Sequence, residues 1–187
     1  AYRVERIVRD LLDLARFESA AAVLDVQDVS LEGLFGRVAA RHGGDATTRG
    51  VQLQTTIEPG AEIVRGDQYR LEQVLQNLAA NALRHVTEGD TVTLHAELRG
   101  GHVVVTVRDT GVGIAEQHLP FIFDRFYKVD ASRSAMAAGS GLGLSIVKAI
   151  VERHGGTIAV ASTPSVGTAF TIVLPSGQDE SALRRSA

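Results

Sequence analysis

The chain has 187 residues, of which 44% are hydrophobic and 22% are charged, and its formal net charge is −3 at pH 7. This length suits one main domain with a single core and an appended element. The small negative charge provides no field that would attract nucleic acid or an anionic membrane, so we expect no nucleic-acid partner. The absence of cysteine excludes disulfides and thiolate metal sites. No apolar run approaches the roughly 18 residues of a membrane helix, and the first residues are no signal peptide, which predicts a soluble chain.

The start of the chain carries apolar residues at three- and four-residue spacing, which predicts an amphipathic helix. These residues are Val4, Ile7, Val8, Leu11, Leu12, Leu14 and Ala15. Because the pattern starts without a capping residue, we interpret the segment as the end of a longer helix. An ordinary core helix fits the same pattern.

Short alternating segments separated by capped helices predict a domain that mixes strands and helices. Strands are expected at residues 23–31, 51–57, 63–65, 92–98, 103–108, 157–161 and 168–174. Ser30 should cap a helix that ends at Gly43 and Gly44, and Asp67 should cap the most regular helix of the chain. A third helix is expected at residues 142–154, and the residues beyond 175 predict a loose tail.

The most regular helix has one polar face. Its apolar residues form a single stripe, whereas Asn77, Asn81 and Arg84 fall together on the roughly opposite side. An asparagine oxygen can coordinate Mg²⁺, which usually takes only one or two protein ligands. Two asparagines one turn apart could therefore hold a metal ion, although solvated surface asparagines would look the same.

The stretch Asp109-Thr-Gly-Val-Gly-Ile114 comes directly after a predicted strand. An ionised carboxylate only accepts hydrogen bonds, so Asp109 could read the exocyclic amine of adenine and would repel the carbonyl oxygen of guanine. Gly111 and Gly113 permit close backbone approach and positive φ. An ordinary turn after a hairpin would use the same residue types.

Residues 121–128 read Phe-Ile-Phe-Asp-Arg-Phe-Tyr-Lys, in a chain with only 5% aromatic residues. They predict an anchor for a mobile segment in which Arg125 and Lys128 face phosphates, or else a small satellite core with solvated cations. Residues 130–140 are small or polar apart from one methionine, which predicts a flexible loop.

A glycine-rich turn at residues 139–145, Gly-Ser-Gly-Leu-Gly-Leu-Ser, leads into the third helix. Glycines at a helix N-terminus expose backbone N–H groups and the positive end of the helix dipole to phosphate. Leu144 breaks the G-x-G-x-x-G pattern, and no Lys-Ser/Thr pair follows as a P-loop requires. The turn therefore indicates a phosphate site of another kind.

In this order, the four stretches resemble the N, G1, F and G2 boxes of the sensor histidine kinase ATPase domain. The resemblance implies an α/β fold of the Bergerat type, a two-layer sandwich with a mixed β-sheet backed by three helices and preceded by an amphipathic helix. It also implies three parts: the end of a dimerisation and phosphotransfer helix at residues 1–20, an ATP-binding catalytic domain at 23–175, and a flexible tail at 176–187.

The resemblance assigns adenine and metal roles to part of the site. Asn81 would be the Mg²⁺ ligand, and His85 would lie beside the adenine. Asp109 would bind the adenine amine while Thr168 assists through a water. The residues that would shape the adenine pocket are Gly111, Gly113 and Ile114.

The phosphate roles form a second group. Asn77 and Arg84 would contact phosphate, whereas Arg125 and Lys128 would stabilise charge at the γ-phosphate, and these four would be the catalytic set. The residues that would border the triphosphate are Gly139, Gly141, Leu142 and Gly143. Residues 123–143 would form a lid.

Two positions depart from the family pattern. His85 stands where tyrosine or phenylalanine is common, although imidazole can also stack on a base. The lid ends Ala137-Ala138-Gly139 where paired glycines are frequent, which would make it slightly stiffer.

Other functions stay open. A related serine kinase or an ATP-driven clamp enzyme would use the same fold, but clamp enzymes carry a glutamate at the position of Asn77 to activate water. An amide cannot act as a base, so hydrolysis should be slow and transfer to a protein nucleophile preferred. A nucleotide-free scaffold would show no thermal shift with Mg-ATP.

None of the six histidines fits the acceptor motif that the family implies, in which an acidic residue, Leu, Arg or Lys, and Pro follow the histidine. We therefore expect the chain to bind Mg-ATP and to phosphorylate a histidine on a dimerisation domain, with no acceptor of its own. The implied partners are that domain of the same protein and a cognate response regulator, within a homodimeric parent. The family also implies a cytoplasmic domain of a membrane sensor.

Overall fold

A computed structural model describes residues 23–129 and 140–176. The predicted first helix lies outside the described residues, as do the predicted loop at 130–140 apart from Ser140, which includes Gly139, and the predicted tail at 176–187 apart from Ser176. Within the described ranges, no helix is long and apolar enough to cross a membrane.

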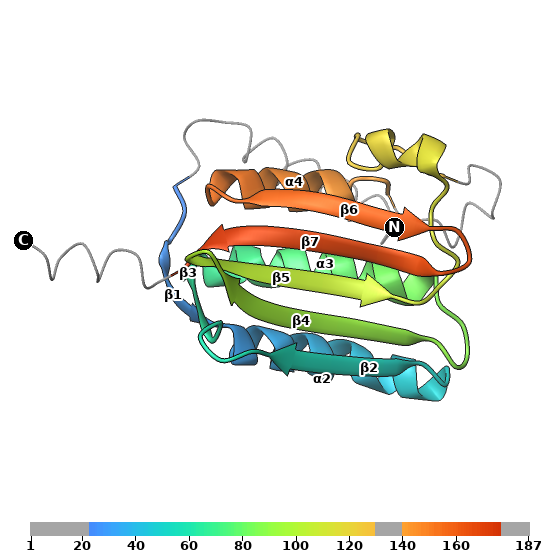
Figure 1. The fold of residues 1–187 in the computed structure, drawn as a ribbon, viewed down its shortest axis with the longest axis horizontal. Helices are drawn as coiled ribbons and strands as arrows, with labels where there is room; N and C mark the ends of the chain where they lie inside the picture. The colour runs from blue at the N-terminus through green and yellow to red at the C-terminus, as the bar shows by residue number, and fades with distance from the viewer. Residues whose placement is uncertain (1–22, 130–139, 177–187) are drawn as a thin grey trace, which may run out of the picture.

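The main sheet has five strands in the spatial order β2-β4-β5-β7-β6 (Figure 1). Its strands are β2 (Gln52–Ile57), β4 (Thr91–Arg99), β5 (His102–Asp109), β6 (Thr157–Thr163) and β7 (Gly167–Pro175). β2 runs parallel to β4, and the other neighbours are antiparallel. The sheet is therefore mixed, as predicted. A separate ribbon pairs β1 (Gln27–Ser30) with β3 (Ile63–Gly66).

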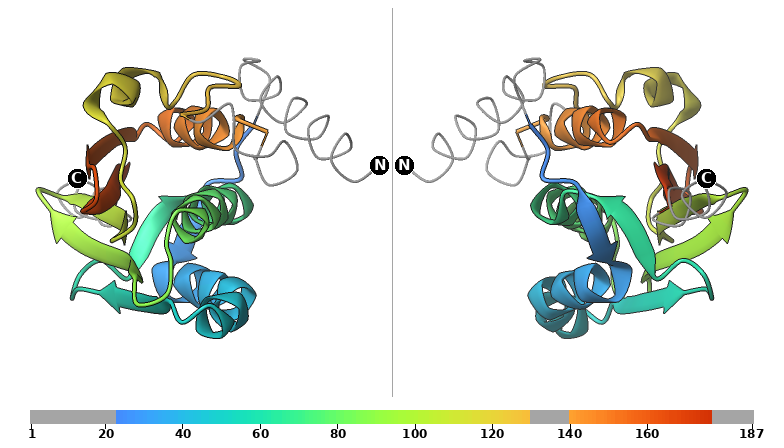
Figure 2. Two further views of the ribbon diagram at one scale, coloured as in Figure 1. Left: turned by 90° about the vertical axis from the view of Figure 1, so that its right-hand side faces the viewer. Right: turned by 90° about the vertical axis from the view of Figure 1, so that its left-hand side faces the viewer.

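Three helices cover one face of the sheet (Figure 2). They are α2 (Leu31–Thr48), α3 (Gln68–Arg84) and α4 (Gly143–Arg153), and a short 3₁₀ helix, η1, spans Glu116–Phe121. Alternate residues of β4 are buried beneath the helices, namely Val92, Leu94 and Ala96. The apolar stripe of α3 packs onto this face because its spacing repeats once per helical turn. The predicted two-layer α/β sandwich is confirmed.

Both predicted N-caps are present. The Ser30 hydroxyl accepts a hydrogen bond from the Gly33 N–H at 3.2 Å, and the Asp67 carboxylate accepts one from the Arg70 N–H at 3.1 Å. Each bond satisfies a backbone donor that has no partner inside the helix. These starts are local in sequence, which is why they could be predicted.

The predicted end of the second helix was wrong, because α2 continues through Gly43 and Gly44 to Thr48. Ala46 is buried in the core and accepts a hydrogen bond from the Val51 N–H at 2.9 Å. Such packing outweighs the roughly 1 kcal/mol helix penalty of each glycine. The turn that ends the helix contains Gly50, whose φ is +67°.

The predicted first strand is shorter than expected. Only Gln27–Ser30 pairs in β1, and residues 23–26 have no regular structure. Its partner β3 has four residues, and Val23 and Val26 are exposed. The alternating pattern of apolar residues in the sequence therefore begins before residue 27, where no neighbouring strand among the described residues is present to pair with it.

Candidate functional site

Most of the predicted site residues lie at one end of the sandwich, on the right of Figure 1. At this end β5 and β6 finish, β7 starts and α3 ends, and η1 lies beside them. The ends of β5, β6 and α3 and the start of β7, which are far apart in sequence, therefore lie together at this end of the sandwich.

Asp109 is the last residue of β5 and is only 4% exposed. Its Oδ1 accepts a hydrogen bond from the Gly111 N–H at 3.0 Å, and the backbone N–H of Thr168, its cross-strand partner, also favours the ionised carboxylate. Burial raises the pKa of Asp109 above its ordinary value, whereas the backbone N–H groups of Gly111 and Thr168 favour the ionised form and oppose that rise. The structure thus holds a buried hydrogen-bond acceptor at the end of a strand, which suits the predicted contact with an amine.

The two glycines after Asp109 have different physical roles. A Cβ atom on Gly111 would lie 2.1 Å from the His85 carbonyl oxygen, and the Val112 N–H donates to that same oxygen at 3.2 Å. Gly113 has a φ of +68°, and its Cβ would lie 2.2 Å from the Thr163 carbonyl oxygen. Gly111 therefore allows the loop to press against the end of α3, and Gly113 allows it to turn against β6.

The polar face of α3 ends beside this loop. Asn77 and Asn81 are half-buried, whereas Arg84 and His85 are exposed. Within residues 23–129 and 140–176, no hydrogen bond joins either asparagine side chain to another residue. The carboxamide oxygens are thus available to a ligand, which fits a Mg²⁺ ion that takes few protein ligands.

Arg49 holds the end of α3 in place, and the sequence reasoning missed it. Its guanidinium donates to the carbonyl oxygens of Leu83 at 2.7 Å and Val86 at 2.8 Å. These carbonyls lie at the end of a helix, where no intrahelical donor satisfies them. An arginine just before Gly50 carries no local signal for this role, because the contact depends on the packing of α2 beside α3.

The aromatic segment is anchored to the core, as one of its two predicted roles requires. Phe123 packs edge-on against Phe170 with ring centroids 6.2 Å apart, and the Tyr127 hydroxyl lies 2.7 Å from His118 Nδ1. Arg125 and Lys128 are exposed on this segment. Their contact with phosphate stays a prediction.

The glycine-rich turn contacts the aromatic segment directly. The Phe126 N–H donates to the Gly141 carbonyl oxygen at 2.9 Å, and Gly141 has a φ of +75°. Leu142 is fully buried, and no side chain of the described residues caps the start of α4. In that part of the chain, no side-chain cap therefore uses the backbone N–H groups of the first turn, which begins at Gly143. Backbone N–H groups exposed in this way at a helix N-terminus bind phosphate in other proteins.

Ser162 is a second residue that the sequence reasoning missed. Its hydroxyl accepts a hydrogen bond from the Ile114 N–H at 2.8 Å, donates to the Gly167 carbonyl oxygen at 2.9 Å, and lies 2.9 Å from Thr168 Oγ1. It therefore ties the loop after β5 to the turn between β6 and β7. Only the strand register could reveal this, since serine is ordinary in an exposed strand.

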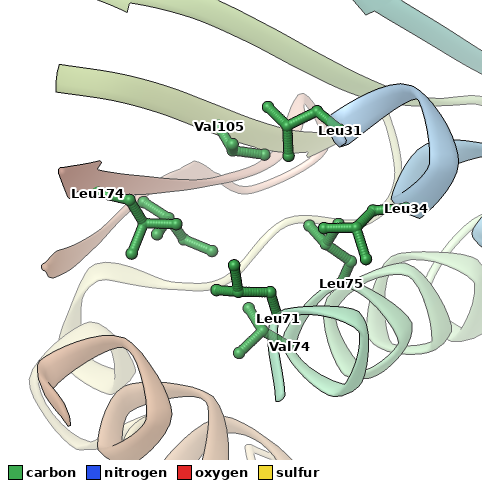
Figure 3. A pocket seen from close by; sticks show the side chains of 8 residues that line it. Leu31, Leu34, Leu71, Val74, Leu75, Val105 and Leu174 are labelled. Atoms are coloured by element: carbon green, nitrogen blue, oxygen red, sulfur yellow. The ribbon is translucent and has the colours of Figure 1, made fainter. Parts of the chain in front are cut away.

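A small hollow elsewhere in the structure has no polar lining (Figure 3). It lies among α2, α3 and the sheet, and its residues are Leu31, Leu34, Leu71, Val74, Leu75, Val105, Ile172 and Leu174. None of the predicted site residues lines it. We interpret it as a packing feature of the core.

Comparison with known proteins identifies the class to which this fold and site belong. Residues 66–178 match the family of histidine kinase-, DNA gyrase B- and HSP90-like ATPases. The chain belongs to this family.

Within the family, the chain is similar to sensor histidine kinases. It is 34% identical to the sensor-like histidine kinase SenX3 of Mycobacterium tuberculosis over 94% of the chain and 42% of that protein. It is 40% identical to the sensor histidine kinase CusS of Escherichia coli over 92% of the chain and 35% of that protein. The chain thus spans less than half the length of these relatives.

Solved structures agree with this assignment. Full-length ShkA in complex with AMPPNP superposes with a TM-score of 0.81 at 32% identity, over 91% of this chain and 35% of that one. Histidine kinase ThkA in complex with response regulator protein TrrA gives 0.75 at 26% identity, over 95% of this chain and 48% of that one.

Proposed function

We propose that this chain binds Mg-ATP and transfers the γ-phosphate to a histidine on a dimerisation domain, as the catalytic domain of a sensor histidine kinase. The observation that carries the proposal is the buried carboxylate of Asp109, held at the end of β5 by a hydrogen bond from the Gly111 N–H. An ATPase family and a neighbour solved with AMPPNP support ATP as the ligand.

Adenine recognition is assigned to the end of β5 and its neighbours. Asp109 would accept a hydrogen bond from the exocyclic amine, and Thr168, its cross-strand partner, would act through a water. Gly111, Gly113 and Ile114 would shape the pocket. His85, at the end of α3, would lie beside the base.

Phosphate and metal binding are assigned to α3, the aromatic segment and the start of α4. Asn81 would hold Mg²⁺, which when bound would neutralise charge on the phosphate oxygens. Asn77 and Arg84 would contact phosphate, and the residues bordering the triphosphate would be Gly139, Gly141, Leu142 and Gly143. Arg125 and Lys128 would stabilise the charge that develops at the γ-phosphate.

Transfer to a protein is favoured over hydrolysis by the residue at position 77. An asparagine amide cannot remove a proton from water, so Asn77 cannot act as a general base. A related serine kinase or a slow ATPase would use the same site, and the similarity to sensor histidine kinases favours a histidine acceptor.

The partners follow from the same assignment. The phosphate acceptor would be a dimerisation domain of the same protein, within a homodimeric parent. A cognate response regulator would receive the phosphate next, as the complex of ThkA with the response regulator protein TrrA suggests by analogy. The parent would be a membrane sensor with this domain on the cytoplasmic side.

The test is incubation with γ-labelled ATP and Mg²⁺, with and without a separate dimerisation domain that carries the acceptor histidine. We expect acid-labile label on the added domain and none on this chain. The control is Asp109→Asn, which should abolish labelling because an amide can present N–H₂ to the adenine amine. Stoichiometric acid-labile label on this chain alone would place the acceptor inside it. No labelling and no thermal shift with Mg-ATP would favour a nucleotide-free scaffold.

A further inference from the structure

Three polar residues lie in one row across neighbouring strands. Asp109 of β5 is directly opposite Thr168 of β7, and Thr168 is directly opposite Ser162 of β6. Residues directly opposite each other in antiparallel strands project to the same face of the sheet. Asp109 and Thr168 are buried, at 4% and 7% exposure.

The hydrogen bonds of Ser162 determine the direction in which the hydroxyl proton of Thr168 points. A serine hydroxyl has one proton to donate and two lone pairs to accept with. The Gly167 carbonyl oxygen can only accept, so it takes the Ser162 proton at 2.9 Å. The Ile114 N–H can only donate, so it occupies one lone pair at 2.8 Å.

The remaining contact joins two hydroxyl groups, Ser162 Oγ and Thr168 Oγ1, at 2.9 Å. Since the Ser162 proton is already used, Thr168 must be the donor in this bond. Its only hydroxyl proton is then directed toward β6. Toward a ligand, Thr168 can act only as an acceptor.

We propose that Ser162 is a specificity-determining residue, because it holds Thr168 as an acceptor beside the acceptor Asp109. This proposal rests on the proposed ATP function and extends it to a residue outside the assigned contacts. The row then presents only acceptors to the base. The exocyclic amine of a 6-aminopurine can donate to these acceptors, and so can a water that donates to Thr168.

A 6-oxopurine meets the opposite situation. It carries a carbonyl oxygen in place of the amine, so two acceptors would face each other in a buried site. If Ser162 lost its hydroxyl, Thr168 could rotate its proton toward that carbonyl oxygen. Part of the discrimination against 6-oxopurines should then disappear.

The experiment compares the dissociation constants of ATP and inosine triphosphate by calorimetry with Mg²⁺ present. Inosine triphosphate has a carbonyl oxygen in place of the amine and a proton on N1, and it is otherwise close to ATP in shape. Both differences are the same for every variant, so the change in preference between variants is the quantity that tests Ser162. Ser162→Ala should lower the wild-type preference for ATP by about tenfold, the effect of one hydrogen bond of about 1.4 kcal/mol. The control is Ser176→Ala, which removes a serine hydroxyl just beyond the other end of β7. Ser176 is buried whereas Ser162 is half-buried, and the Ser176 hydroxyl has no partner among the described residues.

Thr168→Val is the second variant, and it tests the proposal even if Ser162→Ala does not fold. It removes the acceptor without touching the bonds of Ser162 to Ile114 and Gly167, so it should also lower the preference. In the Thr168→Val background, adding Ser162→Ala should change the preference no further.

Equal weakening of both nucleotides by Ser162→Ala would show a merely structural role and overturn the proposal. An unchanged preference in Thr168→Val would overturn it as well. Failure of the wild-type chain to bind ATP would instead contradict the proposed function, so the two failures are distinguishable.

Discussion

Substitution of Gly111 by alanine tests how closely the loop after β5 presses against the end of α3. The new Cβ would lie 2.1 Å from the His85 carbonyl oxygen, whereas carbon–oxygen contacts in proteins are about 3.3 Å or longer. The loop must therefore move away by roughly 1 Å. The Val112 to His85 hydrogen bond, already 3.2 Å long, would be lost at a cost of about 0.5–1.5 kcal/mol.

Overpacking adds a further cost of about 1–3 kcal/mol. The free energy of unfolding of Gly111→Ala should therefore fall by roughly 2–4 kcal/mol, which leaves a typical domain folded. Because the Gly111 N–H also holds the Asp109 carboxylate at 3.0 Å, the same movement should weaken ATP binding at least about tenfold. Urea denaturation and calorimetry measure the two effects.

The matched control is Gly36→Ala in the middle of α2. Nothing lies within 4 Å of the added Cβ there, and the glycine is helical. Its unfolding free energy should rise by about 0.5–1 kcal/mol, with ATP binding unchanged. If Gly111→Ala unfolded like wild type and bound ATP as tightly, the loop could not be packed against α3 as described.

Two further predictions concern Asn81 and His154. Asn81→Ala should make ATP affinity nearly independent of Mg²⁺ in calorimetry, without lowering thermal stability, and a fully retained Mg²⁺ dependence would place the metal elsewhere. His154 Nε2 accepts from the Asp67 N–H at 2.9 Å while Nδ1 bonds the Ile150 carbonyl oxygen at 2.8 Å, so the ring is neutral. Burial lowers the pKa of His154 in the folded protein. The neutral ring should therefore stabilise the fold fully above about pH 6.5, and this stabilisation should be lost as the pH falls through the lowered pKa. The loss should be about 1.4 kcal/mol for each unit by which folding lowers the pKa. Urea denaturation at pH 7.5 and 5.5 should show a smaller pH effect in His154→Gln, and equal effects in both proteins would refute this role.

The site motifs could be predicted because each depends on neighbours in sequence. Asp109 and Gly111 lie within one turn, and the asparagines of α3 share a face through helical periodicity alone. Ser162 and Arg49 gave no such signal. Their roles depend on the pairing of β6 with β7 and on the packing of α2 beside α3.

By itself, the sequence determined the helix starts at Ser30 and Asp67, most of the strands and the order of the four motifs. Caps, periodicity and glycine conformations act over a few residues, so they can be read along the chain. The tertiary structure alone decided that α2 continues past Gly43 and Gly44, that Arg49 holds the end of α3, and that Asp109, Thr168 and Ser162 form one row. These outcomes depend on burial and strand register, which arise only when segments distant in sequence pack together.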